Sequence, residues 1–182
     1  MELLIAEDDP DIALIYRKGL NVKNYKITIA SNGEDCLKIY NEELHKITFD
    51  KIHGNKLYCG SLANNPPFDI VLLDYRMPKI NGLDVAKEIL SINPHQRIIF
   101  ASAYAKETLE ESIKCLKHVV ELMQKPFSLK ELVSTVEDNK IYQDLQKFNV
   151  DIDLVKAVNP THAQLIELLD KVRQTRKTTN VL

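Results

Sequence analysis

Short apolar runs alternate with longer amphipathic stretches along the first 137 residues of the chain. A short apolar run is typical of a buried parallel strand, whereas apolar residues spaced three or four apart indicate a helix. Strand-like runs occupy residues 3–6, 25–30, 70–73, 97–101 and 119–123. Helix-like stretches follow them at residues 12–20, 34–44, 83–90, 109–116 and 129–136. This alternation predicts an α/β fold, in which helices cover both faces of a parallel sheet.

An insertion from about residue 45 to residue 67 interrupts the alternation. It stands where a short helix-to-strand loop would suffice, and a structureless connection of this length is unusual in a compact domain. Residues 47–57 contain enough β-branched and aromatic side chains for a short pair of strands. The sequence leaves two alternatives for the insertion, a hairpin or a mobile flap.

The tail from residue 138 to residue 182 is a second departure. Ile141, Leu145 and Phe148 can continue the preceding helix, and Asn159-Pro160-Thr161 precedes another amphipathic stretch. The tail has seven Lys or Arg against six Asp or Glu, a net charge of plus one. We therefore expect a domain of residues 1–137 followed by a helical C-terminal extension of residues 138–182, with two or three helices.

The composition is that of a protein with a hydrophobic core, at 45% hydrophobic and 27% charged residues. A net charge of −2 argues against broad attraction to nucleic acid or an anionic membrane. The three cysteines are widely spaced, which favours free thiols over a zinc or redox pair. The start, MELLIAEDD, lacks a secretory signal, and no run reaches the about 18 apolar residues of a membrane span. We expect a cytoplasmic protein.

Polar side chains fall at the ends of the predicted strands. These residues are Glu7, Asp8, Asp74, Ser102 and Lys125. In a sheet of order 2-1-3-4-5 the first and third strands are neighbours at the switch point, so the carboxylates lie close together. Clustered carboxylates need a cation, and hard oxygen ligands without His or Cys favour Mg²⁺. With a lysine and a hydroxyl for a phosphate, the assembly suits phosphoryl transfer to a carboxylate.

Four segments in order, LLIAEDDPDI, DIVLLDYRMPKINGLDV, FASA and QKPF, resemble the successive signatures of response-regulator receiver domains. The resemblance covers residues 2–137 and implies a flavodoxin-like, doubly wound, five-stranded parallel sheet of order 2-1-3-4-5. It also implies a two-component response regulator. Such a protein accepts a phosphoryl group from a histidine kinase or phosphotransfer protein in a Mg²⁺-dependent reaction, and then switches conformation to signal to a partner.

The resemblance assigns a role to each site residue. Asp74 would be the phosphoacceptor. Asp8 would ligate Mg²⁺ directly, Glu7 would act largely through water, and the main-chain carbonyl of Arg76 would be a further ligand beside Asp74. Ser102 would turn toward the phosphate, and Lys125 would pair with it. The resemblance further implies a cis peptide bond between Lys125 and the proline that follows.

Three features leave the pattern incomplete. Leu122 stands where many receivers have an aromatic residue, which puts the usual relay from Ser102 in doubt. Tyr104 could gate the access of water to the phosphoryl group or be an ordinary loop aromatic. The Arg76 side chain could lean over the site or point to solvent. Separately, the acids at Asp9 and Asp11 fit a helix N-terminus better than a metal site.

Other functions also fit parts of the sequence. The tail could be the DNA-binding part of a phosphorylation-controlled transcription factor, but no basic recognition helix stands out, which argues against DNA as a partner. A Mg²⁺-dependent aspartyl hydrolase would need an Asp where Arg76 stands. A receiver that no longer takes phosphate is a third alternative. We expect a phosphoacceptor rather than an enzyme, and a homodimer is possible.

Overall fold

A computed structural model of the chain describes residues 1–21, 24–53, 66–104, 113, 116, 121–151, 154–155 and 162–179. By internal contacts the chain divides into two compact units, Met1–Phe127 and Ser128–Leu182. Among the described residues, no helix is both long and apolar enough to cross a membrane.

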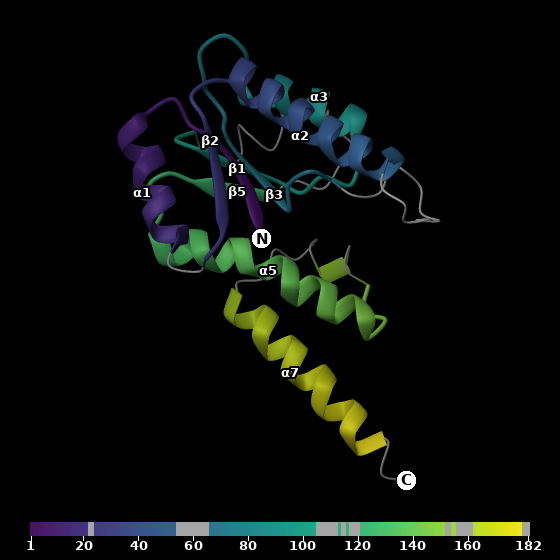
Figure 1. Cartoon of the computed structure of the whole chain (residues 1–182). Helices are drawn as coiled ribbons and strands as arrows, with labels where there is room; N and C mark the ends of the chain where they lie inside the picture. The colour runs from purple at the N-terminus through teal and green to yellow at the C-terminus, as the bar shows by residue number, and fades with distance from the viewer. Residues whose placement is uncertain are drawn as a thin grey trace. The chain divides into compact units, whose positions relative to one another are not determined.

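The first unit is built on a five-stranded parallel sheet in the order β2-β1-β3-β4-β5 (Figure 1). The strands are β1 (Glu2–Ala6), β2 (Lys26–Ala30), β3 (Ile70–Asp74), β4 (Ile98–Ser102) and β5 (Glu121–Gln124). Every residue of β3 and β4 is buried. Continuous apolar runs such as IVLLD are what a central parallel strand requires, because helices cover both of its faces. The predicted strand order is confirmed.

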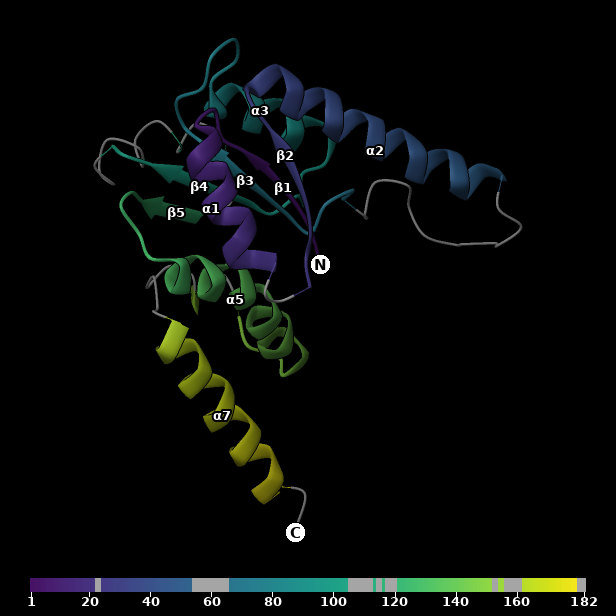
Figure 2. The same cartoon turned by 60° about the vertical axis from the view of Figure 1, so that its left-hand side comes forward.

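Helices α2 (Gly33–His53) and α3 (Gly82–Ile92) lie on one face of the sheet, and α1 (Pro10–Asn21) lies on the other (Figures 1 and 2). The largest core cluster joins buried side chains of the strands to those of α2 and α3, among them Val71, Tyr40 and Ile89. The Asn81 side chain accepts a hydrogen bond from the Asp84 N–H at 2.9 Å, which caps the start of α3.

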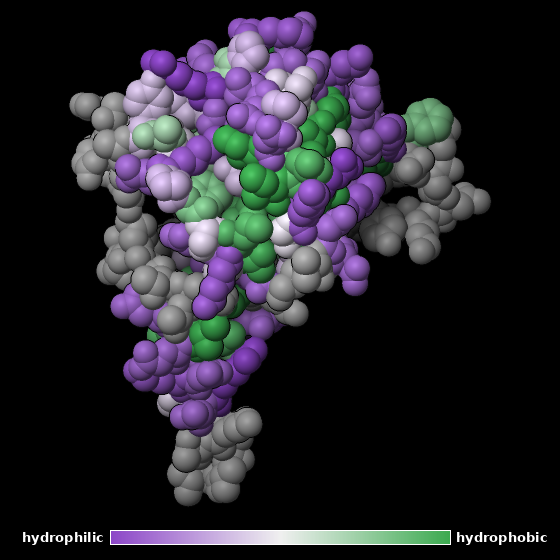
Figure 3. All heavy atoms as spheres, turned by 90° about the vertical axis from the view of Figure 1, so that its left-hand side faces the viewer, coloured by the Kyte–Doolittle hydropathy of each residue, from purple (hydrophilic) through white to green (hydrophobic). Residues whose placement is uncertain are grey.

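Helix α1 covers its face of the sheet with Ala13, Tyr16 and Leu20, which are buried. Its neighbouring side chains Leu14 and Ile15 are 45% and 50% exposed. Figure 3 views the molecule from the side of α1 and shows apolar side chains gathered among polar ones. The helix therefore packs through one face and leaves a partly apolar surface on the other.

The insertion begins as helix and not as a strand pair. Helix α2 continues to His53, so the prediction of a strand beginning at residue 47 is wrong for the described part. No Gly or Pro occurs between residues 34 and 53, so nothing in the sequence stops the helix before Gly54. Lys46 pairs with Glu43 at 2.7 Å across one turn. The rest of the insertion, residues 54–65, lies outside the described residues, as does most of the helix predicted at 109–116.

The second unit contains α5 (Leu129–Lys147) and α7 (His162–Thr179). Leu145 of α5 and Leu165 and Leu169 of α7 are buried together, so the two helices share a small apolar core. A C-terminal helical extension was predicted, with its boundary between residues 137 and 138. This boundary falls inside helix α5, which is continuous from Leu129 to Lys147. The end of the functional domain at residue 137 stays a prediction.

Candidate functional site

Three carboxylates converge at the carboxyl ends of β1 and β3. Ala6 of β1 pairs with Leu73 of β3, which places Glu7 beside Asp74. One ligand oxygen from each of Glu7, Asp8 and Asp74 lies within 4.8 Å of the others. Glu7 and Asp74 are 3% and 9% exposed, while Asp8 is exposed. The predicted metal-binding carboxylates therefore form one group, open to solvent at Asp8.

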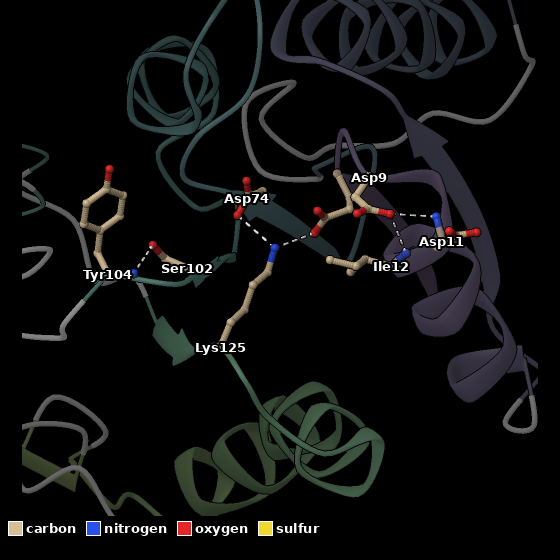
Figure 4. A network of polar contacts seen from close by, with 8 residues as sticks. Asp9, Asp11, Ile12, Asp74, Ser102, Tyr104 and Lys125 are labelled. Atoms are coloured by element: carbon tan, nitrogen blue, oxygen red, sulfur yellow. Dashed lines mark hydrogen bonds and ion pairs between the residues drawn. The ribbon is translucent and has the colours of Figure 1, made fainter.

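Lys125, which follows β5, reaches into this group (Figure 4). Its ammonium nitrogen Nζ donates to Glu7 Oε2 at 2.8 Å and to Asp74 Oδ1 at 3.0 Å. The Lys125 main-chain N–H donates to the Ser102 carbonyl at 2.7 Å, which fixes the start of the turn that carries the side chain. The peptide bond between Lys125 and Pro126 is cis, as predicted.

Burial and charge act on the pKa values of this pair in opposite directions. Burial raises the pKa of Glu7, and the nearby Asp74 and Asp8 charges add to this, although Lys125 partly offsets it. Burial alone would lower the pKa of Lys125, but its hydrogen bonds to Glu7 and Asp74 outweigh that cost and raise it. Lys125 therefore stays charged and neutralises one of the three negative charges.

The donor set fits a divalent cation. It consists of carboxylate oxygens, without His or Cys. Hard oxygen ligands of this kind suit Mg²⁺, which is bound by one or two carboxylates and keeps several waters. One cationic side chain against three carboxylates leaves a negative charge for the ion to balance.

Ser102 lies at the end of β4, on the side of Asp74, and Tyr104 follows two residues later (Figure 4). Ser102 is the last residue of β4 and is 1% exposed. Its hydroxyl oxygen Oγ accepts a hydrogen bond from the Tyr104 main-chain N–H at 3.1 Å. A turn of Ser102 toward a phosphate would give up this bond unless Tyr104 moved with it.

The two predicted modulators of the site, Arg76 and Tyr104, contact each other. The Arg76 guanidinium carbon lies 4.8 Å from the Tyr104 ring centroid, a cation–π contact. Tyr75 packs edge-on against Tyr104, with centroids 5.8 Å apart, and edge-on against Phe100 at 6.3 Å. Tyr75 was missed by sequence reasoning, although an aromatic residue directly after Asp74 was a readable signal. That Arg76 and Tyr104 affect the site stays a prediction.

Asp9 and Asp11, which follow Glu7 and Asp8 in the sequence, lie at the N-terminus of α1. Asp9 Oδ1 accepts hydrogen bonds from the N–H groups of Asp11 and Ile12, at 2.9 and 3.1 Å (Figure 4). Asp11 lies in the first turn of α1. The prediction that these two acids belong to a helix N-terminus is confirmed.

Gly82 is a second residue that the sequence reasoning did not single out. A Cβ atom there would lie 2.2 Å from the main-chain oxygen of Asp74, and the Gly82 N–H donates to the Tyr75 carbonyl at 3.0 Å. Only glycine allows α3 to begin so close to the phosphoacceptor candidate. Its signal was the Asn-Gly step before an amphipathic stretch.

Leu122 lies on β5 and packs, partly buried, against the main core cluster. It is paired in register with Phe100 of β4. An aromatic side chain therefore lies directly beside Leu122, but on β4 and not on β5.

Comparisons with known proteins agree with this fold. The family model of the response regulator receiver domain matches residues 55–137. The response regulator receiver protein CpdR of Brucella abortus (strain 2308) is 26% identical over 135 residues, which cover 74% of this chain and 92% of CpdR. The transcriptional regulatory protein RprY of Bacteroides fragilis (strain YCH46) is 26% identical over 182 residues, covering 98% of this chain and 66% of RprY.

A similar solved structure is the CheX–CheY–BeF3–Mg+2 complex from Borrelia burgdorferi. It has a TM-score of 0.59 and 20% identity, and the match covers 76% of this chain and 87% of that one. At this identity the likeness shows the fold alone. The chain contains a receiver domain of a two-component response regulator. Receiver domains bind Mg²⁺ at an acidic pocket and are partnered with histidine kinases.

Proposed function

We propose that this chain accepts a phosphoryl group on Asp74 in a Mg²⁺-dependent reaction and changes conformation to signal to a partner. The observation that carries the proposal is the Lys125 ammonium, which bridges Glu7 and Asp74 within a group of three carboxylates. The donor would be a phosphohistidine of a histidine kinase or phosphotransfer protein. A small phosphodonor such as acetyl phosphate would serve in vitro.

In the proposed reaction, a carboxylate oxygen of Asp74 attacks phosphorus and forms an acyl phosphate. The bond from phosphorus to the donor breaks, and its electron pair leaves with the histidine nitrogen or with acetate. Lys125 would exchange one carboxylate contact for a contact with the phosphoryl oxygens. The Ser102 hydroxyl would donate a hydrogen bond to another of these oxygens.

Glu7, Asp8 and Asp74, with the main-chain carbonyl of Arg76, would hold the Mg²⁺ ion. When bound, the ion offsets the negative charge that the phosphoryl oxygens bring to the carboxylates. Asp8 is the exposed member of the three and the one free of a Lys125 contact among those described, so it is the direct ligand in our proposal.

The phosphoacceptor claim can be tested by mass spectrometry after incubation with acetyl phosphate and Mg²⁺. The wild type should gain one phosphoryl group, and Asp74→Asn should not. Asp170→Asn changes an exposed acid of α7 in the same way and should react like the wild type. A wild type that gains no mass would overturn the proposal, and an equal gain in Asp74→Asn would show that another residue accepts the group.

We further propose that the chain acts as a phosphoacceptor and catalyses at most its own phosphorylation and dephosphorylation. Arg76 occupies the position where an aspartyl hydrolase would have its acid–base Asp, which supports this view. Steady release of phosphate from a generic phosphate ester, over many turnovers, would contradict it.

A second candidate function is that of a transcription factor controlled by phosphorylation. The alignment with RprY, a transcriptional regulatory protein, favours it because it extends over 98% of this chain and so includes the tail. The tail's net charge of plus one weighs against it. Binding of the phosphorylated chain to random DNA fragments, weakening steeply as salt rises, would support this candidate. If the phosphorylated chain binds no DNA even at low salt, the transcription-factor candidate is excluded.

A further inference from the structure

Among the described residues, the backbone hydrogen bond that holds the turn carrying Lys125 lies at the start of that turn. The Lys125 N–H donates to the Ser102 carbonyl, but the next residue, Pro126, has no N–H to donate and is exposed. The residue after it, Phe127, stacks its ring on Tyr16 of α1, with centroids 5.5 Å apart and ring planes 17° apart. The ring pair thus supplies a contact where the proline cannot supply a hydrogen bond.

Tyr16 lies within electrostatic range of the carboxylates that Lys125 contacts. Its side chain belongs to the buried face of α1 and is 6% exposed. Burial raises its pKa, and the negative charges of Glu7 and Asp74 raise it further. The Tyr16 side chain therefore contacts Phe127 after Lys125 and also lies in the electrostatic field of Glu7 and Asp74.

Helix α1 connects the carboxylates of the site with the turn that follows Lys125. The helix begins directly after Glu7 and Asp8, and Asp9 caps its first turn. Its start is therefore tied to the carboxylates, and its second turn, through Tyr16, is tied to the chain that follows Lys125. A shift of α1 would move the carboxylates and the lysine turn together.

We propose that Tyr16, through its stack on Phe127, is a positioning residue that sets where the Lys125 ammonium lies between Glu7 and Asp74. A lysine side chain is a flexible four-carbon stem, so its ammonium samples many positions unless the backbone that bears it is fixed. A flat ring against a flat ring restrains Phe127 more narrowly than an aliphatic side chain would. This inference rests on the proposed function, because Lys125 matters for phosphoryl transfer only if Asp74 accepts the group.

The test compares Tyr16→Phe, which keeps the ring, with Tyr16→Leu, which removes the stack. The readouts are the rate of phosphorylation by acetyl phosphate with Mg²⁺ and the affinity for beryllofluoride. We expect Tyr16→Leu to lower both about threefold to tenfold, and Tyr16→Phe to stay within about twofold of the wild type. Leu20→Val, on the same buried face of α1, is the matched control and should lose stability without losing rate.

A second background separates positioning from general destabilisation. Lys125→Ala keeps Asp74 and the carboxylate ligands, so a slower reaction remains measurable. If Tyr16 acts through the lysine, adding Tyr16→Leu to Lys125→Ala should cause no further loss. A further loss as large as in the wild-type background would overturn the inference.

Phe127→Leu removes the stack from its other side and should reproduce the effect of Tyr16→Leu, so the test holds if one of the two variants fails to fold by circular dichroism. A wild type that responds to neither acetyl phosphate nor beryllofluoride would overturn the proposed function itself. A responsive wild type together with unchanged Tyr16→Leu and Phe127→Leu variants would overturn only the positioning role.

Discussion

Replacing Lys125 by methionine would remove the cation that separates two buried carboxylates while keeping an unbranched side chain. The ammonium makes charged hydrogen bonds of 2.8 and 3.0 Å to Glu7 and Asp74, and its side chain is 18% exposed. A hydrogen bond to a charged group contributes about 1.5–3 kcal/mol. The loss falls short of two full bonds, because Glu7, whose pKa burial already raises, can take up a proton once the lysine is gone. We expect Lys125→Met to lower the free energy of unfolding by about 2–3 kcal/mol without metal.

The same substitution should increase the stabilisation that Mg²⁺ provides. In the wild type the ammonium would compete with the ion for the oxygens of Glu7 and Asp74 and would repel it. If the variant binds Mg²⁺ about tenfold more tightly, saturating metal returns about 1.4 kcal/mol more stability to it than to the wild type. Thermal unfolding with and without Mg²⁺, followed by circular dichroism, measures both effects, and the loss without metal corresponds to a Tm lower by roughly 5–10 °C.

Lys26→Met is the matched control. Lys26 pairs with Glu2 at 3.0 Å, but the two side chains are 67% and 45% exposed. An exposed pair of this kind contributes only about 0–1 kcal/mol, so this variant should melt close to the wild type with or without Mg²⁺. If Lys125→Met melts like Lys26→Met, or if Mg²⁺ stabilises it no more than the wild type, the reasoning about the bridging ammonium is refuted.

Three further outcomes follow from the contacts around the site. Arg76→Ala and Tyr104→Ala should each change the lifetime of the acyl phosphate by roughly twofold to tenfold, because each removes one partner of the cation–π contact beside Ser102. The decay of a radiolabelled phosphoryl group measures this lifetime, and unchanged lifetimes in both variants would exclude the two residues as modulators. Gly82→Ala should destabilise the domain by roughly 2–4 kcal/mol, because its Cβ would lie 2.2 Å from the Asp74 main-chain oxygen, and a urea midpoint equal to that of the wild type would contradict this. Burial raises the pKa of Cys36 to about 12 from 9.0, so the thiol loses its proton in the unfolded chain first. Its contribution to stability should fall as pH rises above about 9, and iodoacetamide should label it at pH 8 only under unfolding conditions.

The strand ends could be read from the sequence because burial and chemistry meet there. IVLLD is apolar up to its last residue, and a carboxylate in that position is expensive unless a function or a partner requires it. The same contrast marked Glu7 after β1 and Ser102 at the end of β4. A parallel sheet brings the carboxyl ends of neighbouring strands together, so the predicted strand order was enough to place most of the site residues close to one another.

The contacts between side chains could not be read in this way. Tyr16 has the spacing of an ordinary core residue of α1, and nothing in the sequence indicates that its ring meets Phe127, 111 residues further on. The contact of Arg76 with Tyr104 depends on how two loops return from adjacent strands. The extent of α2 was misjudged for a local reason, since β-branched and aromatic residues near its end suggested strands, while the absence of Gly and Pro let the helix continue to His53.

The position of the aromatic residues bears on how a signal could leave the site. With Leu122 on β5, a ring that swings inward beside that strand is not available at this position. Tyr75, Tyr104 and Phe100 form a chain of edge-on contacts at the ends of β3 and β4, and the Tyr104 N–H holds the Ser102 hydroxyl. A movement of Ser102 toward a phosphate would therefore be felt first by Tyr104, and through its ring by Tyr75 and Arg76. In the proposed switch, these same contacts flank the phosphoacceptor candidate, so a substitution that changes the lifetime of the acyl phosphate would also be expected to change the conformational response.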